Sequence, residues 1–260
     1  MSRAGRRRRL ARTLLGVAVF AAALLAWEVA AEGSFQVPTA SEVADRAWQD
    51  WPSAEFRSDV TESLKRLAAG FVLGAGLGVA AGLLMGSSHA LRRALDPLVE
   101  LTRATPPIAL VPALVVLLDY GDSMQIAVIA FGVCFPVLVN TVDGIRAVSP
   151  EARDTASMLQ VGRVERIFRI NLPAALPSIF AGLRIAVSVG LVMVVISEFA
   201  GTGDGLGRYI VEKQGQVDVT GVWAGILFLG LLGLVLNRLF LLVERRALAW
   251  HHGATGERLS

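Results

Sequence analysis

Five polar side chains lie inside long apolar stretches and are the first candidates for chemistry in this sequence. They are Asn140, Asp143, Arg184, Ser197 and Glu198. Ionisable groups at membrane depth are costly, so they indicate function or a specific partner. For Asp143 and Glu198 the alternative is a position at the end of a span, where solvent reaches the carboxylate. For Arg184 we favour a structural role, either an ion pair with an acid such as Asp143 or a guanidinium extended to the membrane surface.

The sequence lacks the residues that the common enzymatic centres need. No glycine is followed by lysine, so the chain has no phosphate-binding loop of the Walker A type. His89, His251 and His252 fall in polar turns or in the tail, away from any apolar segment that holds a nucleophile. The single cysteine, Cys134, lies in an apolar run, and no Cys/His cluster has metal-ligand spacing. We therefore predict no catalytic residue, no metal site and no cofactor in this chain.

Composition indicates that membrane helices carry the polar side chains. Hydrophobic residues make up 54% of the 260 residues, and the mean hydropathy is +0.57. Several runs reach the length of about 18 residues or more that spans a bilayer. The sequence thus predicts an all-α integral membrane protein with about six transmembrane helices. We expect these helices over residues 14–31, 59–85, 94–118, 124–145, 174–200 and 219–243.

Arginine residues gather on one side of the predicted helices. Six of them lie within residues 3–12, and pairs follow at Arg92-Arg93 and Arg245-Arg246. Basic residues are in excess on the cytoplasmic side, so both chain ends and the polar stretch that begins at residue 150 are predicted to be cytoplasmic. The basic residues flank apolar segments and form no nucleic-acid-binding patch; the expected surroundings are the lipid bilayer.

The first apolar run has two interpretations. Val29-Ala30-Ala31 has the form of a signal-peptide cleavage site. The run is long enough to span, and more spans follow, so we favour an uncleaved helix over residues 14–31. The predicted organisation is then a basic cytoplasmic N-terminus over residues 1–13, this first helix, a core over residues 59–243 with five transmembrane helices, and a cytoplasmic tail over residues 244–260.

Small residues and prolines predict how two of the helices pack and bend. Gly70, Gly74, Gly78 and Gly82 recur every four residues and so lie near one helix face, where they let another helix approach closely. In the segment 94–118, the backbone hydrogen bonds are interrupted at Pro106, Pro107 and Pro112. Broken helices persist in membranes where protein or a water-filled cavity satisfies the freed backbone groups.

Residues 150–177 form a polar, arginine-rich and helix-prone stretch between two apolar runs. We expect one short helix with Glu151 near its positive end and Gly162 at its C-terminus. A second short helix with an apolar edge that includes Ile167 should follow, and Leu172-Pro173 should end it. Two short helices folded on each other would make a compact knob that a soluble partner can bind.

Residues 154–173 resemble the cytoplasmic "EAA" loop of permease subunits in ATP-binding-cassette (ABC) importers. That pattern is Glu-Ala-Ala, three residues, Gly, and then Leu-Pro at a fixed distance. Counting back from Leu172-Pro173, Asp154-Thr155-Ala156 fall on Glu-Ala-Ala and Gln160 falls on the glycine. The chain departs from the pattern at Gln160, and Gly162 is the candidate to supply the hinge instead.

Further matches point to the nitrate/sulfonate/taurine branch of these permeases. They are Val37-Pro38-Thr39, Ser63–Phe71, Asp96-Pro97-Leu98, Thr105–Pro112, Leu172–Ala186, and Glu198 with Gly205-Leu206-Gly207. The resemblance implies a type I ABC importer permease in a bacterial plasma membrane. It also implies a second permease copy, two ATP-binding subunits that hold ATP and Mg²⁺, and an extracytoplasmic solute-binding protein.

The resemblance also implies roles for individual residues. The coupling loop over residues 150–173 would contact the ATPase through Glu151, Asp154, Thr155, Ala156, Leu159, Gln160, Gly162, Val164, Ile167, Leu172 and Pro173. The candidates for the translocation path are Thr105, Pro106, Asn140, Ser197 and Glu198. A small anion such as a sulfonate, taurine or nitrate is the expected solute. A pyrimidine vitamin precursor, an amino acid or a betaine is the alternative, and a membrane scaffold or enzyme is the alternative from another class.

Overall fold

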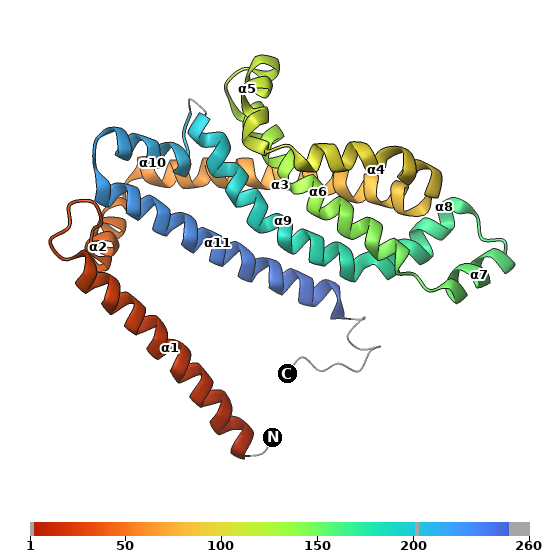
Figure 1. Ribbon diagram of the computed structural model, residues 1–260, viewed down its shortest axis with the longest axis horizontal. Helices are drawn as coiled ribbons and strands as arrows, with labels where there is room; N and C mark the ends of the chain where they lie inside the picture. The colour runs from red at the N-terminus through yellow and green to blue at the C-terminus, as the bar shows by residue number, and fades with distance from the viewer. Residues whose placement is uncertain (1–2, 201–202, 250–260) are drawn as a thin grey trace. The chain divides into compact units, whose positions relative to one another are not determined.

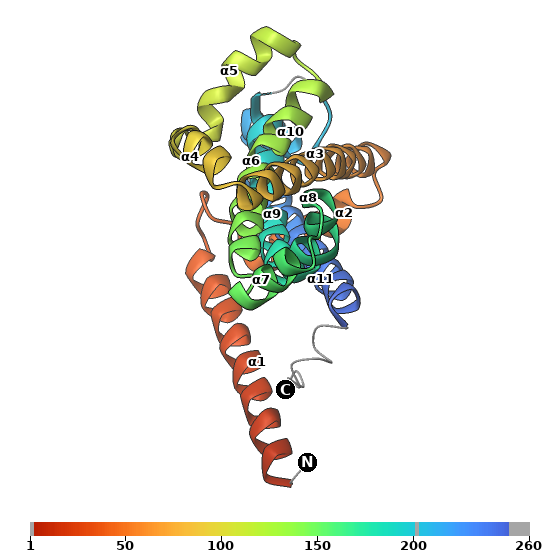
Figure 2. The same ribbon diagram turned by 90° about the vertical axis from the view of Figure 1, so that its right-hand side faces the viewer.

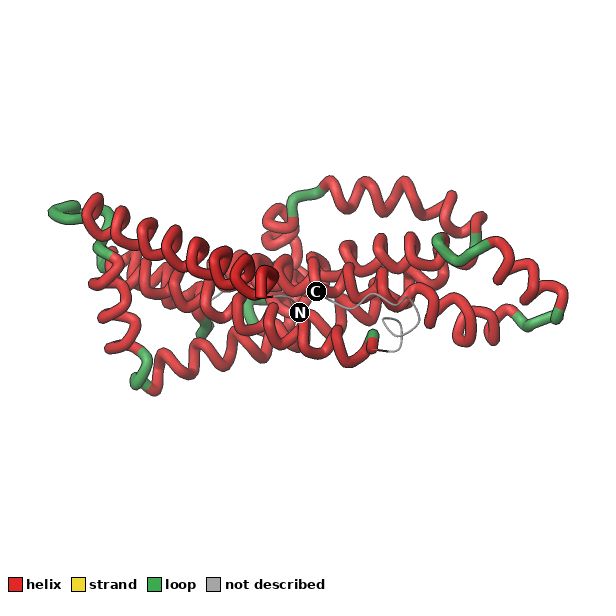
Figure 3. Tube along the Cα trace, turned by 90° about the horizontal axis from the view of Figure 1, so that it is seen from below, coloured by secondary structure: helices red, strands yellow, loops and turns green. Residues whose placement is uncertain are grey.

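The computed structural model of the protein describes residues 3–200 and 203–249, without the side chains of residues 3–11, 150, 152–153 and 163–164. The described residues form helices and loops and no strand, as Figure 3 shows. The predicted all-α class is therefore confirmed. The chain divides into two compact units, one of Met1–Arg57 with Tyr209–Phe228 and one of Ser58–Arg208 with Leu229–Ser260.

Within residues 3–200 and 203–249, five helical segments are long and apolar enough to cross a membrane. They are Arg12–Ala31 of α1 (Arg3–Ala31), α3 (Ala54–Ser87), α6 (Asp122–Arg146), Ile167–Ala200, which ends in α9 (Leu172–Ala200), and α11 (Val219–Ala247). The helices α4 (His89–Ala104) and α5 (Pro107–Leu118) meet the criterion only as a pair. Counting that pair as one span gives six, which agrees with the predicted number.

The α4–α5 pair bends by 97° at Thr105-Pro106. Each of these two residues precedes a proline and is extended, with ψ of 122° and 127°, because a following proline ring disfavours the helical region. Figure 2 shows α5 turning away from α4. The expected segment 94–118 is wrong at its start: α4 begins at His89 because Ser88 accepts a hydrogen bond from the Leu91 amide and caps it.

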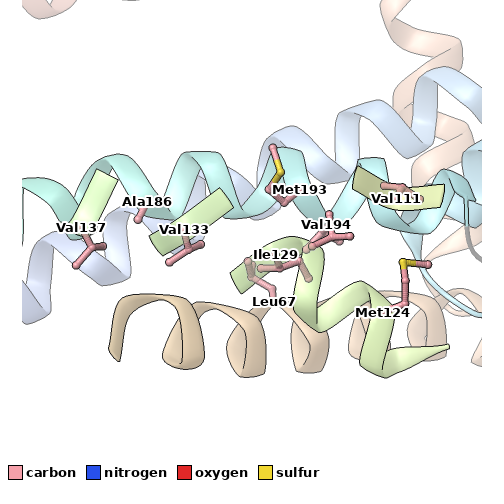
Figure 4. Close-up of a cluster of buried hydrophobic side chains, with 10 residues drawn as sticks. Leu67, Val111, Met124, Ile129, Val133, Val137, Ala186, Met193 and Val194 are labelled. Carbon is pink, nitrogen blue, oxygen red and sulfur yellow. The ribbon is translucent and has the colours of Figure 1, made fainter. Parts of the chain in front are cut away.

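The core of the larger unit lies where α6 and α9 pack along each other (Figure 1). Apolar side chains from α3, α5, α6 and α9 meet there, and Figure 4 shows Ile129, Val133 and Met193 among them. The predicted glycine face of α3 packs on α6. A Cβ at Gly74 would overlap the Ala130 carbonyl, and the other glycines of the repeat are similarly close to α6. The two backbones approach closely because these positions carry no side chain.

The smaller unit is held by a polar network around α2 (Ala40–Asp50). Thr39 caps this helix, and the Glu42 carboxylate accepts a hydrogen bond from the Thr39 amide at 2.9 Å. Arg46 binds Asp218 at 2.7 Å. Burial opposes ionisation of Asp218, but the hydrogen bonds from the Gly221 amide and from Arg46 outweigh it and lower the pKa of Asp218.

Candidate functional site

The coupling loop is built from α7 (Pro150–Met158), α8 (Arg163–Arg166) and the π-helix η1 (Ile167–Asn171), which runs directly into α9. In Figure 1, α7 and α8 extend beyond the ends of α6 and α9. Glu151 and Asp154 are exposed in α7, while Ala156 is buried. The Thr155 hydroxyl donates to the Glu151 carbonyl at 2.8 Å. In the predicted Glu-Ala-Ala-like motif, Ala156 thus faces inward and Asp154 faces solvent.

Gln160, and not Gly162, makes the turn after α7. Gln160 has a left-handed backbone with φ of 52°. Its amide donates to the Ser157 carbonyl at 3.1 Å, and the next amide, that of Val161, donates to the Ala156 carbonyl at 3.0 Å. This is a Schellman motif, in which the left-handed residue follows the helix cap. The expectation that Gly162 ends the helix is wrong. Its carbonyl accepts a hydrogen bond from the Arg166 amide, which is the first hydrogen bond of the next helix, α8.

Leu172-Pro173 does not end the second helix, contrary to the prediction. The Leu172 amide donates to the Ile167 carbonyl, five residues back, as a π-helix requires. Pro173 lies in the first turn of α9. The wide π-helical turn that precedes it leaves room for the proline ring and needs no hydrogen bond from the N–H that proline lacks. The helix therefore continues from the loop into the core without a break.

Apolar side chains are exposed on the coupling loop. Met158 is 83% exposed, Leu159 is 71% exposed and Phe168 is 60% exposed. Ile167 and Leu172 are only partly exposed. The side chain of Val164 lies outside the described residues. The loop thus presents a small apolar surface, which we call the loop anchors: Met158, Leu159 and Phe168.

A second feature is a cavity of about 340 Å³ beside the α4–α5 break. Thr105 and Asn140 line it, as does Arg103, while Phe131 and Phe135 contribute aromatic walls. The Asn140 amide donates to the Pro136 carbonyl at 2.8 Å, which fixes the side chain against α6. We call this hollow the break cavity. Pro106 caps α5 beside it and is not part of its lining.

Sequence reasoning missed Arg103, which brings the positive charge to the break cavity. The guanidinium lies 3.1 Å from Glu100, and the arginine side chain is 43% exposed. The signal was present in the sequence: Arg92, Asp96, Glu100 and Arg103 follow one another at helical spacing and mark one charged face of α4. Placing the start of a membrane span at residue 94 obscured that face.

Ser197 and Glu198 lie elsewhere, in a buried network at the other end of α9. Glu198 is 2% exposed and Ser197 is fully buried. The Glu198 carboxylate accepts from the Ser63 hydroxyl at 2.6 Å and from the Gly207 amide at 2.7 Å. The Ser197 hydroxyl donates to the Val194 carbonyl of its own helix. This burial conflicts with the prediction that Ser197 and Glu198 line the translocation path, and with the alternative that solvent reaches Glu198 at the end of a span. The polar atoms of both side chains bond to groups of the protein and not to a cavity.

Arg66 and the loop after α9 complete the Glu198 network. Arg66 lies 3.6 Å from the Glu198 carboxylate and donates to Asp122 at 2.7 Å and to the Asp204 carbonyl. Gly205 has φ of +138°, and a Cβ there would overlap the Glu198 carboxylate. The glycine lets the loop pass over the acid, which then receives the amide of Gly207 in the first turn of α10 (Leu206–Gly215).

Two further polar residues are placed by ion pairs. Arg184 binds Glu244 of α11, with the Nε atom 3.1 Å from the carboxylate. An ion pair with an acid was one of the two structural roles expected for Arg184, and the acid is Glu244 and not Asp143. Asp143 lies 3.9 Å from Arg146 one turn along α6, and both are exposed. In the part of the chain that the structure describes, no three His, Cys, Asp or Glu side chains come close enough to hold a metal ion.

Similar proteins identify the family. The model of the family described as "Binding-protein-dependent transport system inner membrane component" matches residues 74–248. The aliphatic sulfonates transport permease protein SsuC of Bacillus subtilis (strain 168) is 32% identical over 78% of this chain and 74% of its own length. The bicarbonate permease CmpB of Synechococcus elongatus and the nitrate permease NrtB of Synechocystis sp. are each 32% identical over 70% of this chain and 66% of their own lengths.

Solved structures agree on the fold. A bacterial ABC transporter that imports the acidic polysaccharide alginate has a TM-score of 0.64 at 17% identity, over 93% of this chain and 96% of that one. An amino acid ABC transporter has a TM-score of 0.59 at 18% identity, over 73% of this chain and 92% of that one. Identities this low show the fold alone. The family match and the sulfonate relative establish that the chain belongs to the binding-protein-dependent transport system inner membrane components, the permease subunits of ABC importers.

Proposed function

We propose that the chain forms the translocation path of an ATP-driven importer for a small anion. The observation that carries this proposal is the break cavity, where Arg103, Thr105 and Asn140 stand among apolar walls. The three relatives are named as permeases for aliphatic sulfonates, bicarbonate and nitrate, and all three solutes are small anions. A cationic group in a largely apolar hollow attracts an anion more strongly than it would in water.

Arg103 is suited to transient binding. Its present partner is Glu100 at 3.1 Å, an exposed ion pair of the kind worth only about 0–1 kcal/mol. An arriving anion can therefore replace the Glu100 carboxylate at little cost, and Glu100 can displace the anion again. The Thr105 hydroxyl donates to the Leu101 carbonyl and satisfies one backbone group that the break frees.

Transport requires partners, and the coupling loop is the part that would receive energy from them. We propose that two ATP-binding subunits, which hold ATP and Mg²⁺, bind the loop anchors of two permease copies, and that a solute-binding protein delivers the anion. Continuity of η1 with α9 gives the loop a direct helical connection to the core. Both chain ends and the coupling loop would then be cytoplasmic.

Uptake by proteoliposomes tests the proposed path. The chain is reconstituted with its ATPase and binding protein, and ATP-dependent uptake of labelled sulfonate, taurine, nitrate and bicarbonate is measured. Arg103→Gln should reduce uptake of the transported anion about tenfold or more, whereas Arg103→Lys should retain part of it. Arg93→Gln is the matched control, because it removes the same charge from an exposed position of α4 outside the cavity lining. Uptake of a neutral or cationic solute instead would overturn the assignment of an anion.

Co-purification of the ATPase tests the coupling loop. Truncating an interface anchor typically costs more than about 1 kcal/mol and a hot spot about 2 kcal/mol or more. Leu159→Ala with Phe168→Ala should therefore weaken ATPase binding roughly tenfold or more. Glu165→Ala is the control, since it removes only an exposed pair with Arg169 at 2.9 Å. Undiminished binding and coupling after the double truncation would exclude the loop anchors as the contact.

Labelling of introduced cysteines tests the topology. In a Cys134→Ser background, Leu159→Cys should react with an impermeant thiol reagent only in inverted vesicles, and Asp204→Cys only in intact cells. Both positions are exposed, so the reagent reaches them on whichever side they lie. Reaction of Leu159→Cys in intact cells would place the coupling loop outside and contradict the proposed contact with an ATPase.

A further inference from the structure

A second cavity, with a mostly polar lining, lies at the base of the coupling loop, where η1 comes near the end of α3, the start of α4 and the end of α6. Its volume is about 340 Å³. The polar residues that line it are Ser87, His89, Arg92, Arg146, Arg166 and Asn171, and the rest of the lining is apolar or glycine. We call it the basic cavity. It is separate from the break cavity, with which it shares no lining residue.

The charge of the basic cavity is one-sided. Among the side chains that the structure describes, three guanidinium groups line it and no carboxylate does. Among the described residues, Arg166 has no acid within ion-pair distance, and it therefore brings an uncompensated charge to the cavity. Such a lining of cations and hydrogen-bond donors matches the oxygen atoms of an anion.

A second arginine of the lining, Arg92, is only loosely paired. Its Nε atom lies 3.5 Å from Asp96 but is buried and makes no hydrogen bond in the described part of the chain. A buried donor without an acceptor carries a desolvation cost, so an incoming oxyanion would relieve it. The Arg92 guanidinium thus keeps a donor available.

The local backbone helps to shape the basic cavity. The π-helix η1 places Asn171, which is 6% exposed, in the lining, and the amide donates to the Ser87 hydroxyl at 3.4 Å. A π-turn redirects side chains and is frequent at functional sites. The bond between η1 and the end of α3 therefore joins the coupling loop to the cavity wall.

We propose that the basic cavity binds a phosphate-type oxyanion and so links an anionic group to the base of the coupling loop. Arginine is suited to this ligand because its planar fork donates two parallel hydrogen bonds to phosphate oxygens. The group has two possible sources, the headgroup of an anionic phospholipid or free phosphate. Basic pockets between membrane helices are known to take lipid headgroups.

Thermal stability of the full-length chain, co-purified with its ATPase in detergent, tests the proposal. The unfolding midpoint is followed while inorganic phosphate, short-chain phosphatidylglycerol or short-chain phosphatidylcholine is added. Binding to the folded state raises the midpoint with ligand concentration. At least one of the two anionic probes should raise it at concentrations where phosphatidylcholine does not. Stabilisation by phosphatidylglycerol alone identifies a lipid headgroup, and stabilisation by inorganic phosphate as well identifies the free anion.

Variants locate the effect. Arg166→Gln and Arg92→Gln should each raise the half-saturating probe concentration about tenfold, while Arg93→Gln, the exposed neighbour on α4 outside the lining, should leave it unchanged. Arg166 has no described acid partner, so its replacement breaks no ion pair of the fold. The proposal is overturned if neither anionic probe stabilises the wild type or if Arg93→Gln weakens binding equally. It is also overturned if Arg92→Gln and Arg166→Gln release the ATPase without affecting probe binding, which would mean that a protein acid occupies the cavity.

Discussion

Removing the Glu198 carboxylate should first unfold the C-terminal end of α9. Glu198→Ala leaves the Ser63 hydroxyl, the Gly207 amide and the Arg66 guanidinium without their shared acceptor. Ser63 is 1% exposed and Arg66 is 7% exposed, so water does not readily replace the carboxylate. Breaking a buried pair by deleting one partner costs about 3–5 kcal/mol.

The conservative variant should fall between wild type and alanine. Glu198→Gln keeps one carbonyl acceptor, but its NH₂ group takes the place of the other. That group faces either the Gly207 amide, which is a donor, or the Ser63 hydroxyl, whose proton then loses its acceptor. One such unsatisfied buried contact costs about 1–3 kcal/mol. Ser197→Ala is the matched control, since this hydroxyl bonds only to the Val194 carbonyl of its own helix and its loss should cost less than about 1 kcal/mol.

Thermal unfolding in detergent and hydrogen exchange measure these differences. The alanine variant should lower the unfolding midpoint by on the order of 10 °C, because about 1 kcal/mol corresponds to roughly 2–4 °C in a chain of this size. Amides of residues 205–207 should lose protection first. The reasoning is refuted if Glu198→Ala unfolds like Ser197→Ala, or if Glu198→Gln abolishes transport with stability and protection unchanged. The second result would restore Glu198 to the translocation path.

Three further predictions concern the turn after α7, the glycine face and the polar network around α2. Gln160→Gly should stabilise that turn, because left-handed backbone costs a non-glycine residue about 1–2 kcal/mol, and slower amide exchange at Val161 would report the gain. Gly162→Ala should leave stability unchanged, since nothing lies within 4 Å of the new Cβ. A loss of stability in Gly162→Ala would refute the placement of the turn at Gln160. Gly74→Ala should lower the unfolding midpoint by collision with α6, whereas Gly76→Ala, with no atom within 4 Å, should keep or raise it; equal midpoints would contradict close packing. Because the pKa of Asp218 is lowered on folding, its carboxylate stabilises the folded state above its unfolded pKa, and this stabilisation is lost as the pH falls through the folded pKa. Unfolding midpoints measured over a pH series should therefore fall less steeply towards acid pH in Asp218→Asn than in the wild type. The same pH dependence in both proteins would exclude this contribution of Asp218.

Local patterns were sufficient to predict the membrane helices and the loop between α6 and α9. Apolar runs of spanning length, the four-residue glycine repeat and the paired prolines at residues 106–107 each act on the chain within a few turns. Their consequences therefore follow from residue type and spacing alone. The resemblance to the nitrate/sulfonate branch, which comparison with known proteins confirms, also rests on such short motifs.

Turn geometry required the structure. The departure at Gln160 predicts that a nearby glycine, Gly162, makes the turn. In the structure Gln160 accepts the left-handed conformation, since two backbone hydrogen bonds close the turn around it. Sequence states which residue adopts this conformation most easily, but the position of the turn depends on where the helix before it must end.

Tertiary structure alone decided which polar residues share a site. Glu198 and Ser63 are 135 positions apart and meet in a closed network, while Asn140 joins Arg103 at a cavity formed by a bend. An ionisable residue in an apolar run has the same appearance in sequence whether it lines a path or ties two helices together. The outcome depends on which donors the packed helices bring within about 3 Å, and this distance is set by contacts between residues far apart in the chain.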